Sequence, residues 1–140
     1  MSVTAAPPRS QVDAAVAGLV AFLESGSAPA DLFTPDAFAD LTSPWWRVQA
    51  AGTAAVVALR TGSHPFAGKV DVRRVDATAS GFVLEIEERW PHDGQHWYCR
   101  ELLRADLRDG RIAELSVYCT GDWDEERQRE HAATVTLLRN

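Results

Sequence analysis

The sequence predicts an α+β fold, in which helices in the first part of the chain precede a curved antiparallel β-sheet. Near the start, Val12, Val16, Leu19 and Leu23 recur at the spacing of one helix face. From Lys69 onward the apolar residues fall instead into short runs typical of strands, with Asp-Gly pairs between some of them. Because strands do not alternate with helices, the pattern favours an antiparallel meander over a parallel sheet.

Three helices are expected before the meander. Ser10 and Asp13 have the spacing of a capping box, which satisfies free backbone N–H groups at a helix start. Thr34-Pro35 resembles a second start, since proline is tolerated in a first turn, where its missing N–H has no partner. The elements expected in this part are a helix that ends near Gly26, a short helix from Thr34, a strand over Pro44–Gln49 and a helix over Thr53–Arg60 closed by Gly62.

The meander has four expected strands, and its turns fix how they pair. Asp-Gly is a preferred type I′ hairpin pair, because both central residues need positive φ. If Asp93 and Gly94 are the central residues of such a turn, Glu88 pairs with Cys99 and residue 86 pairs with Glu101. The expected strands are Lys69–Thr78, Gly81–Trp90, His96–Leu107 and Arg111–Thr120.

This register sorts the side chains into two faces of the sheet. One face is apolar, but Glu88, Cys99 and Glu101 fall on it, so it is expected to hold a polar-floored pocket. One extra residue near Ala113, a β-bulge, keeps the last strand in phase and places Cys119 opposite Glu101. The other face carries a ladder of opposite charges from Glu85, Glu87, Arg89, Arg100 and Arg104.

Four segments carry a resemblance to a known superfamily. They are LFTPDAF (Leu32–Phe38), PWWRVQAAG (Pro44–Gly52), DGRIAELSVY (Asp109–Tyr118) and CTGDWDEE (Cys119–Glu126). In this order, the elements resemble the nuclear transport factor 2-like superfamily, and within it SnoaL-like proteins of actinobacterial type. The resemblance runs from about Ser10 to His131.

The resemblance implies a cone-like α+β barrel, in which a curved antiparallel sheet wraps around three N-terminal helices. It also implies a pocket between sheet and helices, and a homodimer. Relatives include ketosteroid isomerase, polyketide cyclases, limonene epoxide hydrolase and scytalone dehydratase, alongside non-catalytic domains, so the fold alone selects no reaction. The epoxide-hydrolase pattern has an aspartate where this chain has Val117, which argues against that mechanism.

Glu88 and Glu101 are the candidate catalytic residues. A carboxyl group on a desolvated pocket floor has a raised pKa and can transfer a proton near neutral pH. Arg47 is the expected charge partner. The alternative is structural, because buried ion pairs place glutamates in the same way.

A flat, apolar ligand with oxygen atoms would suit the many tryptophans of the chain. The alternative for each tryptophan is core or interface packing. His92 and His96 flank a turn and fall on opposite faces, so no metal site is expected. The expected ligand-binding residues are Trp46, Arg47, Trp90, Trp97, Cys99, Cys119 and Trp123.

Composition narrows the class of protein. The 140 residues fit one domain, expected over 10–140 after a flexible tail over 1–9. A net charge of −6 without a basic cluster argues against nucleic acid, and no apolar run is long enough to span a membrane. The two cysteines are expected to stay unlinked, as in a cytoplasmic protein.

The leading hypothesis is a cofactor-free acid–base enzyme, an isomerase, cyclase, dehydratase or hydrolase. The alternative is a non-catalytic ligand-binding or dimerisation module.

Overall fold

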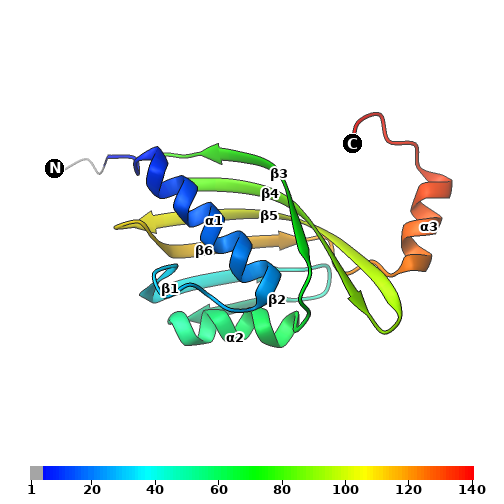
Figure 1. Cartoon of the computed structure of the whole chain (residues 1–140), viewed down its shortest axis with the longest axis horizontal. Helices are drawn as coiled ribbons and strands as arrows, with labels where there is room; N and C mark the ends of the chain where they lie inside the picture. Colours follow the sequence, from blue (N-terminus) through cyan, green and yellow to red (C-terminus); the bar gives the residue numbers. More distant parts are fainter. Residues whose placement is uncertain (1–4) are drawn as a thin grey trace.

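A computed structural model describes residues 5–140, in which a mixed six-stranded sheet is accompanied by three helices (Figure 1). Residues 1–4 of the expected tail lie outside the described part, and residue 9 already belongs to the first helix. The elements are α1 (Arg9–Ser25), β1 (Phe33–Thr42), β2 (Arg47–Ala51), α2 (Thr53–Ser63), β3 (Lys69–Ala77), β4 (Gly81–His92), β5 (Gln95–Arg108), β6 (Arg111–Cys119) and α3 (Glu125–Thr134).

Helix α1 lies across one face of the sheet and buries the predicted apolar stripe (Figure 1). Its end is as expected, since Gly26 adopts the left-handed conformation, φ 76°, that a glycine C-cap provides. Its start is not. The expected capping box is wrong, because Pro8 is the N-cap residue and Ser10 lies within the first turn without a capping hydrogen bond.

The expected helix from Thr34 is wrong, because that segment forms strand β1. Pro35 fits in this strand since the ladder with β6 is interrupted between Phe33 and Phe38, where a missing N–H costs no hydrogen bond. The strand runs parallel to β6 and antiparallel to β2, so the sheet is mixed rather than purely antiparallel. Its order, β2-β1-β6-β5-β4-β3, leaves edges at β2 and β3, and the expected closed barrel is not formed.

The long β4–β5 hairpin has the predicted register. Glu88 pairs with Cys99, and Ile86 pairs with Glu101. Asp93 and Gly94 both have positive φ, as a type I′ turn requires. The predicted bulge is also present, since Asp106 pairs with Glu114 and Leu107 with Ile112, which leaves Ala113 without a partner.

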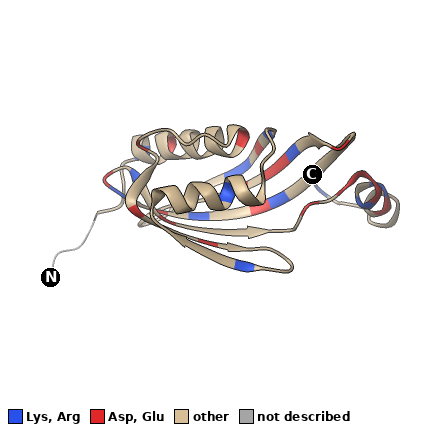
Figure 2. Ribbon diagram, turned by 90° about the horizontal axis from the view of Figure 1, so that it is seen from below, with Lys and Arg blue, Asp and Glu red and all other residues tan. Residues whose placement is uncertain are grey.

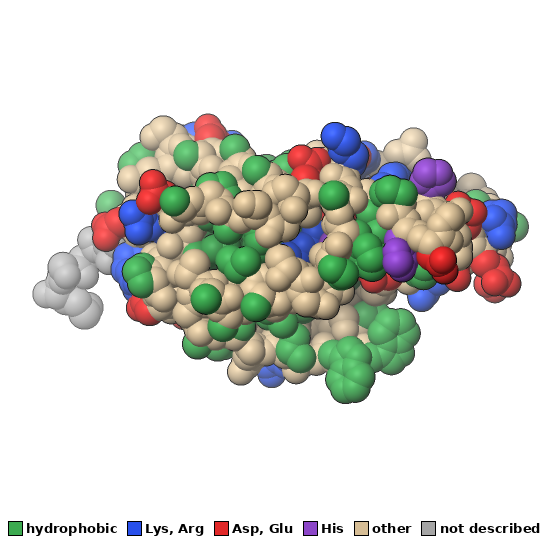
Figure 3. Space-filling model, turned by 60° about the horizontal axis from the view of Figure 1, so that its bottom comes forward, with side chains coloured by type: hydrophobic (Ala, Val, Ile, Leu, Met, Phe, Trp, Pro, Cys, Tyr) green, Lys and Arg blue, Asp and Glu red, His purple; other side chains and the backbone are tan. Residues whose placement is uncertain are grey.

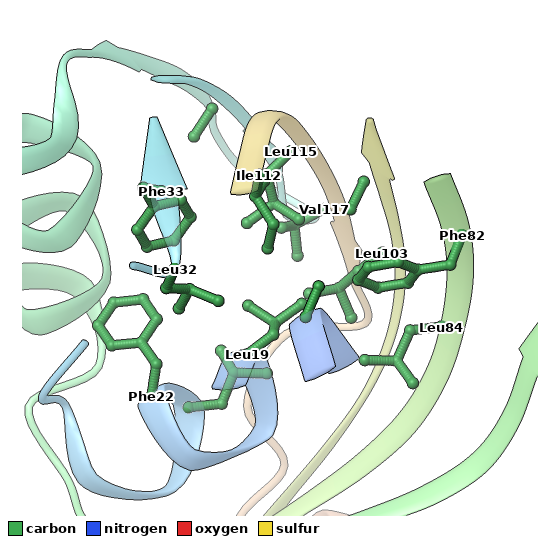
Figure 4. Packing of buried hydrophobic residues seen from close by; sticks show 14 of the residues in the cluster. Leu19, Phe22, Leu32, Phe33, Phe82, Leu84, Leu103, Ile112, Leu115 and Val117 are labelled. Carbon is green, nitrogen blue, oxygen red and sulfur yellow. The ribbon is translucent and has the colours of Figure 1, made fainter. Parts of the chain in front are cut away.

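The core lies between α1, the start of β1 and the inner face of β4–β6 (Figure 4). Leu19 and Phe22 from α1 belong to this core, and the rings of Phe22 and Phe33 are in edge contact at 5.7 Å between centroids. Phe82 and Leu103 complete the opposite wall and are fully buried. Acidic and basic residues lie close together along the strands of the sheet (Figure 2). Arg100 donates to Glu85 at 2.7 Å, as the predicted ladder of the outer face requires.

The third helix follows the sheet rather than preceding it. Helix α3 stands at the far end of the molecule, beyond the β4–β5 turn (Figure 1), so the expectation of three N-terminal helices is wrong. Its N-cap is Asp124, whose side chain accepts a hydrogen bond from the Arg127 N–H at 2.9 Å. Within the described residues, no helix is both long and apolar enough to cross a membrane.

Candidate functional site

A pocket of about 540 Å³ opens between α2, the β1–β2 turn and the ends of β5 and β6. The surface on the α2 side shows hydrophobic side chains around a recessed basic group (Figure 3). Its walls are largely apolar and include Leu41, Val48 and Leu59. Its polar groups are Arg60, His64, Cys99, Glu101, Cys119 and Asp122.

A buried ion pair between Arg60 and Glu88 supports the pocket floor. Arg60 Nη2 lies 2.6 Å from Glu88 Oε1, and Nη1 lies 3.1 Å from Oε2, so the contact is bidentate. Arg60 Nη2 also donates to the Leu23 carbonyl at 2.7 Å, which ties α2 to α1. Burial alone would raise the pKa of Glu88, but hydrogen bonds from Glu101 and Arg60 lower it overall. Glu88 is therefore an anion at neutral pH.

Glu101 is the second buried carboxyl group, and it lines the pocket. Only 7% of its surface is exposed, and it has a hydrogen bond to Glu88. Burial raises the pKa of Glu101 well above its usual range, and the neighbouring Glu88 anion raises it further. Two adjacent carboxyl groups thus hold one proton, with Glu88 ionised and Glu101 neutral.

The expected charge partner of these glutamates is wrong. Arg47 lies on β2 and binds Asp40, with Nη2 2.7 Å from Oδ2. The partner is Arg60, which the sequence reasoning missed. A signal for it was present, because Val56, Arg60 and His64 follow at intervals of four residues and so share one face of α2.

His64 was also missed. Its ring lies against Trp90, with 4.4 Å between centroids, and against Phe66 at 5.4 Å. Burial, together with the charge of Arg60, lowers the pKa of His64 to about 4, so the ring is neutral at pH 7. Trp90 lies behind this ring and is itself buried, which makes it a support of the pocket rather than an open wall.

The expected tryptophans divide between the pocket and other places. Trp46 lines the pocket at its mouth and is 72% exposed. Trp97 lies outside this pocket and donates through Nε1 to the His92 carbonyl at 3.0 Å. Trp123 is also elsewhere, in edge contact with Tyr98 at 5.7 Å. Trp45, which was not among the expected site residues, also lines the mouth.

Cys99, Cys119 and Asp122 complete the polar side of the pocket. Cys119 pairs with Glu101 across the β5–β6 ladder, as predicted, and both thiols are free. Cys99 Sγ lies 3.4 Å from Glu101 Oε1. Burial raises the pKa of Asp122, and the Glu88 charge adds to this increase.

Among the described residues, one group could hold a metal ion. Cys99, Glu101 and Cys119 each offer a ligand atom, and these atoms lie within 4.8 Å of one another. Two sulfurs and one oxygen would suit a thiophilic ion, but each side chain would first have to lose its proton. The expectation of no metal and no cofactor stays a prediction.

Comparisons with solved structures identify the fold. A protein from Anabaena variabilis described as NTF2-like superposes with a TM-score of 0.69 at 15% identity, covering 87% of this chain and 96% of that chain. An NTF-2 like protein of unknown function from Burkholderia xenovorans gives 0.61 at 18% identity, with 94% and 98% covered. A protein from Catenulispora acidiphila with a ketosteroid isomerase-like fold, solved with trimethylamine, gives 0.62 at 12% identity, with 76% and 85% covered.

Sequence comparison adds nothing to this assignment, since no family model and no curated protein matches the chain. Other solved structures with this fold are described as putative isomerases and as an epoxide hydrolase. Identities this low establish the fold and not the activity. The chain therefore has the nuclear transport factor 2-like, or ketosteroid isomerase-like, fold.

Proposed function

We propose that the protein is a small-molecule enzyme that performs acid–base chemistry without a cofactor on a hydrophobic, oxygenated substrate. Glu101 is the proton donor, and Asp122 is the proton acceptor. The reaction class is proton transfer next to a carbonyl group, which serves an isomerase, cyclase or dehydratase.

The observation that supports this proposal best is the state of Glu101. A neutral carboxyl group at the wall of an apolar pocket can donate to a substrate oxygen and stabilise the negative charge that develops there. Such a group stays protonated at neutral pH only if its surroundings disfavour the anion. Burial and the adjacent Glu88 anion together do this.

Glu88 and Arg60 are positioning residues in this proposal. The bidentate contact fixes the Glu88 anion beside Glu101, and this anion keeps the Glu101 carboxyl group protonated. Glu101 has a single O–H, so its hydrogen bond passes from Glu88 to the substrate oxygen when a substrate binds. Arg60 has one further donor, Nε, which is buried without a partner among the described residues. Glu88 itself does not line the pocket, so it is not expected to touch the substrate.

Asp122 is the base because it is the other carboxyl group of the pocket lining. Its raised pKa makes it a stronger base than an ordinary surface aspartate, while Glu88 stays ionised below it. When two carboxyl groups act as acid and base, their surroundings have to separate their pKa values, so that one keeps its proton while the other is ionised. Leu41, Val48 and Trp46 would then hold the carbon skeleton.

The test is deuterium exchange at the α carbon of cyclic ketones in D₂O, followed by proton NMR. Proton transfer of this kind contributes roughly 10²–10⁴-fold to a rate, so Glu101→Gln should lose about that factor. Glu114→Gln, an exposed change on β6, is the matched control and should keep the wild-type rate. Exchange by Glu101→Gln at the wild-type rate would remove Glu101 from the mechanism. Exchange by no protein above the buffer rate would favour the non-catalytic module.

A homodimer formed through the outer sheet face belongs to the same proposal. Leu102 is 47% exposed and Tyr118 is 60% exposed, and these two residues pair across β5 and β6. In a two-fold symmetric dimer, the interface would bury this pair of residues on both protomers. Light scattering should give about twice the 15.3 kDa of one chain, and a monomer mass at micromolar concentration would contradict the proposal.

A further inference from the structure

Three side chains with metal-binding atoms meet on the inner face of the sheet. Cys99 and Glu101 are two residues apart on β5, so they point to the same side, and Cys119 on β6 pairs directly with Glu101. The two sulfurs and one carboxyl oxygen all lie within 4.8 Å of one another. Because β5 and β6 are inner strands of the sheet, regular backbone rather than a loop holds these atoms together.

The spacing of these atoms is close to that of a tetrahedral metal site. Bonds of about 2.3 Å to sulfur and about 2.1 Å to oxygen place two sulfurs about 3.8 Å apart, and a sulfur and an oxygen about 3.6 Å apart. Cys99 Sγ already lies 3.4 Å from Glu101 Oε1. Since no separation in the group exceeds 4.8 Å, the atoms have to approach by about 1 Å or less to bind one ion.

The three ligands are open to the pocket. Cys99, Glu101 and Cys119 all line it, which gives an ion a path from solvent and leaves a fourth coordination position on the pocket side. The Gly121 N–H donates to Cys119 Sγ at 3.4 Å. A metal-bound thiolate can keep this hydrogen bond, which then orients the ligand.

The charges around the group favour a cation. Glu88 Oε2 lies 4.0 Å from Cys99 Sγ, and Asp122 lines the same pocket. Arg60 is the cation nearby, but both of its terminal nitrogens bind Glu88, and this ion pair offsets its charge. An incoming metal ion therefore meets carboxyl groups and no free positive charge among the pocket residues.

We propose that Cys99, Glu101 and Cys119 bind a thiophilic divalent metal ion, of which Zn²⁺ is the common example. Two sulfur ligands select such an ion over Mg²⁺ and Ca²⁺. Two metal–sulfur bonds and one metal–oxygen bond form, and the protons of the three side chains pass to the buffer, so no oxidant or reductant is needed. This site is separate from His92 and His96, on which the expectation of no metal was based.

The bound ion would inhibit the proposed function. When Glu101 is a metal ligand it carries no proton, so it cannot donate to a substrate oxygen, and the ion occupies the wall against which the substrate would lie. The metal-free protein is then the active form. This consequence rests on the proposed function, whereas the metal site itself does not.

Titration with Co²⁺ tests the site in reduced protein that a chelator has freed of metal. Cobalt reports thiolate ligands by a sulfur-to-cobalt charge-transfer band and tetrahedral geometry by intense visible bands. Wild type should bind one equivalent with both signals, and Zn²⁺ should displace it. Cys119→Ser should lose about half of the charge-transfer intensity and at least about 100-fold in affinity, since even a change next to a ligand costs about 10–100-fold.

Glu101→Gln should keep the charge-transfer band and weaken binding by at least about tenfold, because it removes the oxygen ligand and leaves both sulfurs. Glu114→Gln and His96→Gln are the matched controls, as both residues are exposed and outside the group, and both variants should keep the wild-type affinity. The wild-type spectrum needs no variant to fold. Its lack of a charge-transfer band in excess Co²⁺ would refute the site, as would a Cys119→Ser variant that binds as tightly as wild type.

Ketone exchange in the presence of metal separates this inference from the proposed function. One equivalent of Zn²⁺ should slow the exchange by roughly 10²-fold or more, and a chelator should restore it. If cobalt shows the two-sulfur spectrum but the zinc-loaded protein exchanges at the metal-free rate, Glu101 is not the donor, and the proposed function fails while the metal site remains. If the exchange needs Glu101 but no charge-transfer band forms, the metal site fails and the proposed function remains.

Discussion

Replacing Glu101 by Gln should stabilise the protein at neutral pH, and by more as the pH rises. In the unfolded chain Glu101 is ionised above its ordinary pKa of about 4.3, whereas in the folded protein it keeps its proton. Folding therefore takes up one proton, and this uptake becomes less favourable as the pH increases. Gln has no such cost, and its amide can still donate to Glu88.

The magnitude follows from the single proton. Because the folded state binds one more proton than the unfolded state, wild-type stability falls by about 1.4 kcal/mol for each pH unit above the unfolded pKa. The difference between Glu101→Gln and wild type should thus grow by about 2.7 kcal/mol between about pH 5 and about pH 7. The increase stops where the pH passes the folded pKa of Glu101. His64 titrates in both proteins, so its contribution cancels in the difference.

Urea denaturation followed by tryptophan fluorescence measures this difference at each pH. Glu114→Gln is the control and should run parallel to wild type, because that carboxyl group is exposed. A difference between Glu101→Gln and wild type that does not change with pH would show that Glu101 is ionised in the folded protein. A loss of several kcal/mol at neutral pH would instead make Glu101 an ion-pair partner of Arg60, and the reasoning would fail.

Three further predictions concern other residues of the chain. Arg60→Met should cost about 3–5 kcal/mol in urea denaturation, because it leaves the Glu88 anion buried, and adding Glu88→Gln should recover part of this loss. Gly81→Ala should unfold or strongly destabilise the protein, since its Cβ would lie 2.0 Å from the Ala105 carbonyl oxygen, whereas Gly62→Ala in α2 should raise stability by about 0.5–1 kcal/mol. His64 has a pKa that falls to about 4 on folding, so acid destabilises the wild-type protein and should not act in this way on His64→Phe. Between about pH 6.5 and about pH 5 the free energy of unfolding of wild type should fall by about 1.5 kcal/mol relative to the variant.

The hairpins could be predicted because their information is local. Two Asp-Gly pairs fix the turns, and alternation then decides which side chains face the core. The bulge at Ala113 follows from the same argument, since only one extra residue keeps Leu115 and Val117 inside. The shared face of Glu88, Cys99, Glu101 and Cys119 was therefore accessible from the sequence.

Strand β1 could not be predicted in this way, because its pairing is distant. It joins β6 in parallel across more than seventy residues, and no turn specifies that register. A hydroxyl before a proline is a common helix start, and here the tertiary pairing overrides this local preference. The proline is tolerated only where the ladder is interrupted, a position that depends on β6 itself.

The error over Arg47 has a different physical origin, and it concerns the chemistry most directly. An arginine beside two tryptophans on a strand looks like a pocket residue, yet the register of β1 and β2 places Asp40 within its reach. Arg60 looks like the polar side of a short helix until α2 is laid against the sheet, where Val56 becomes buried and Arg60 turns inward with it. A buried arginine needs a carboxylate, and the hairpin had already placed one without a partner at Glu88. The unpaired Glu88 anion on the sheet therefore predicts a buried cation opposite it, and the apolar face of α2 supplies that cation as Arg60. Because Arg60 pairs with Glu88, Glu101 is the carboxyl group that keeps its proton.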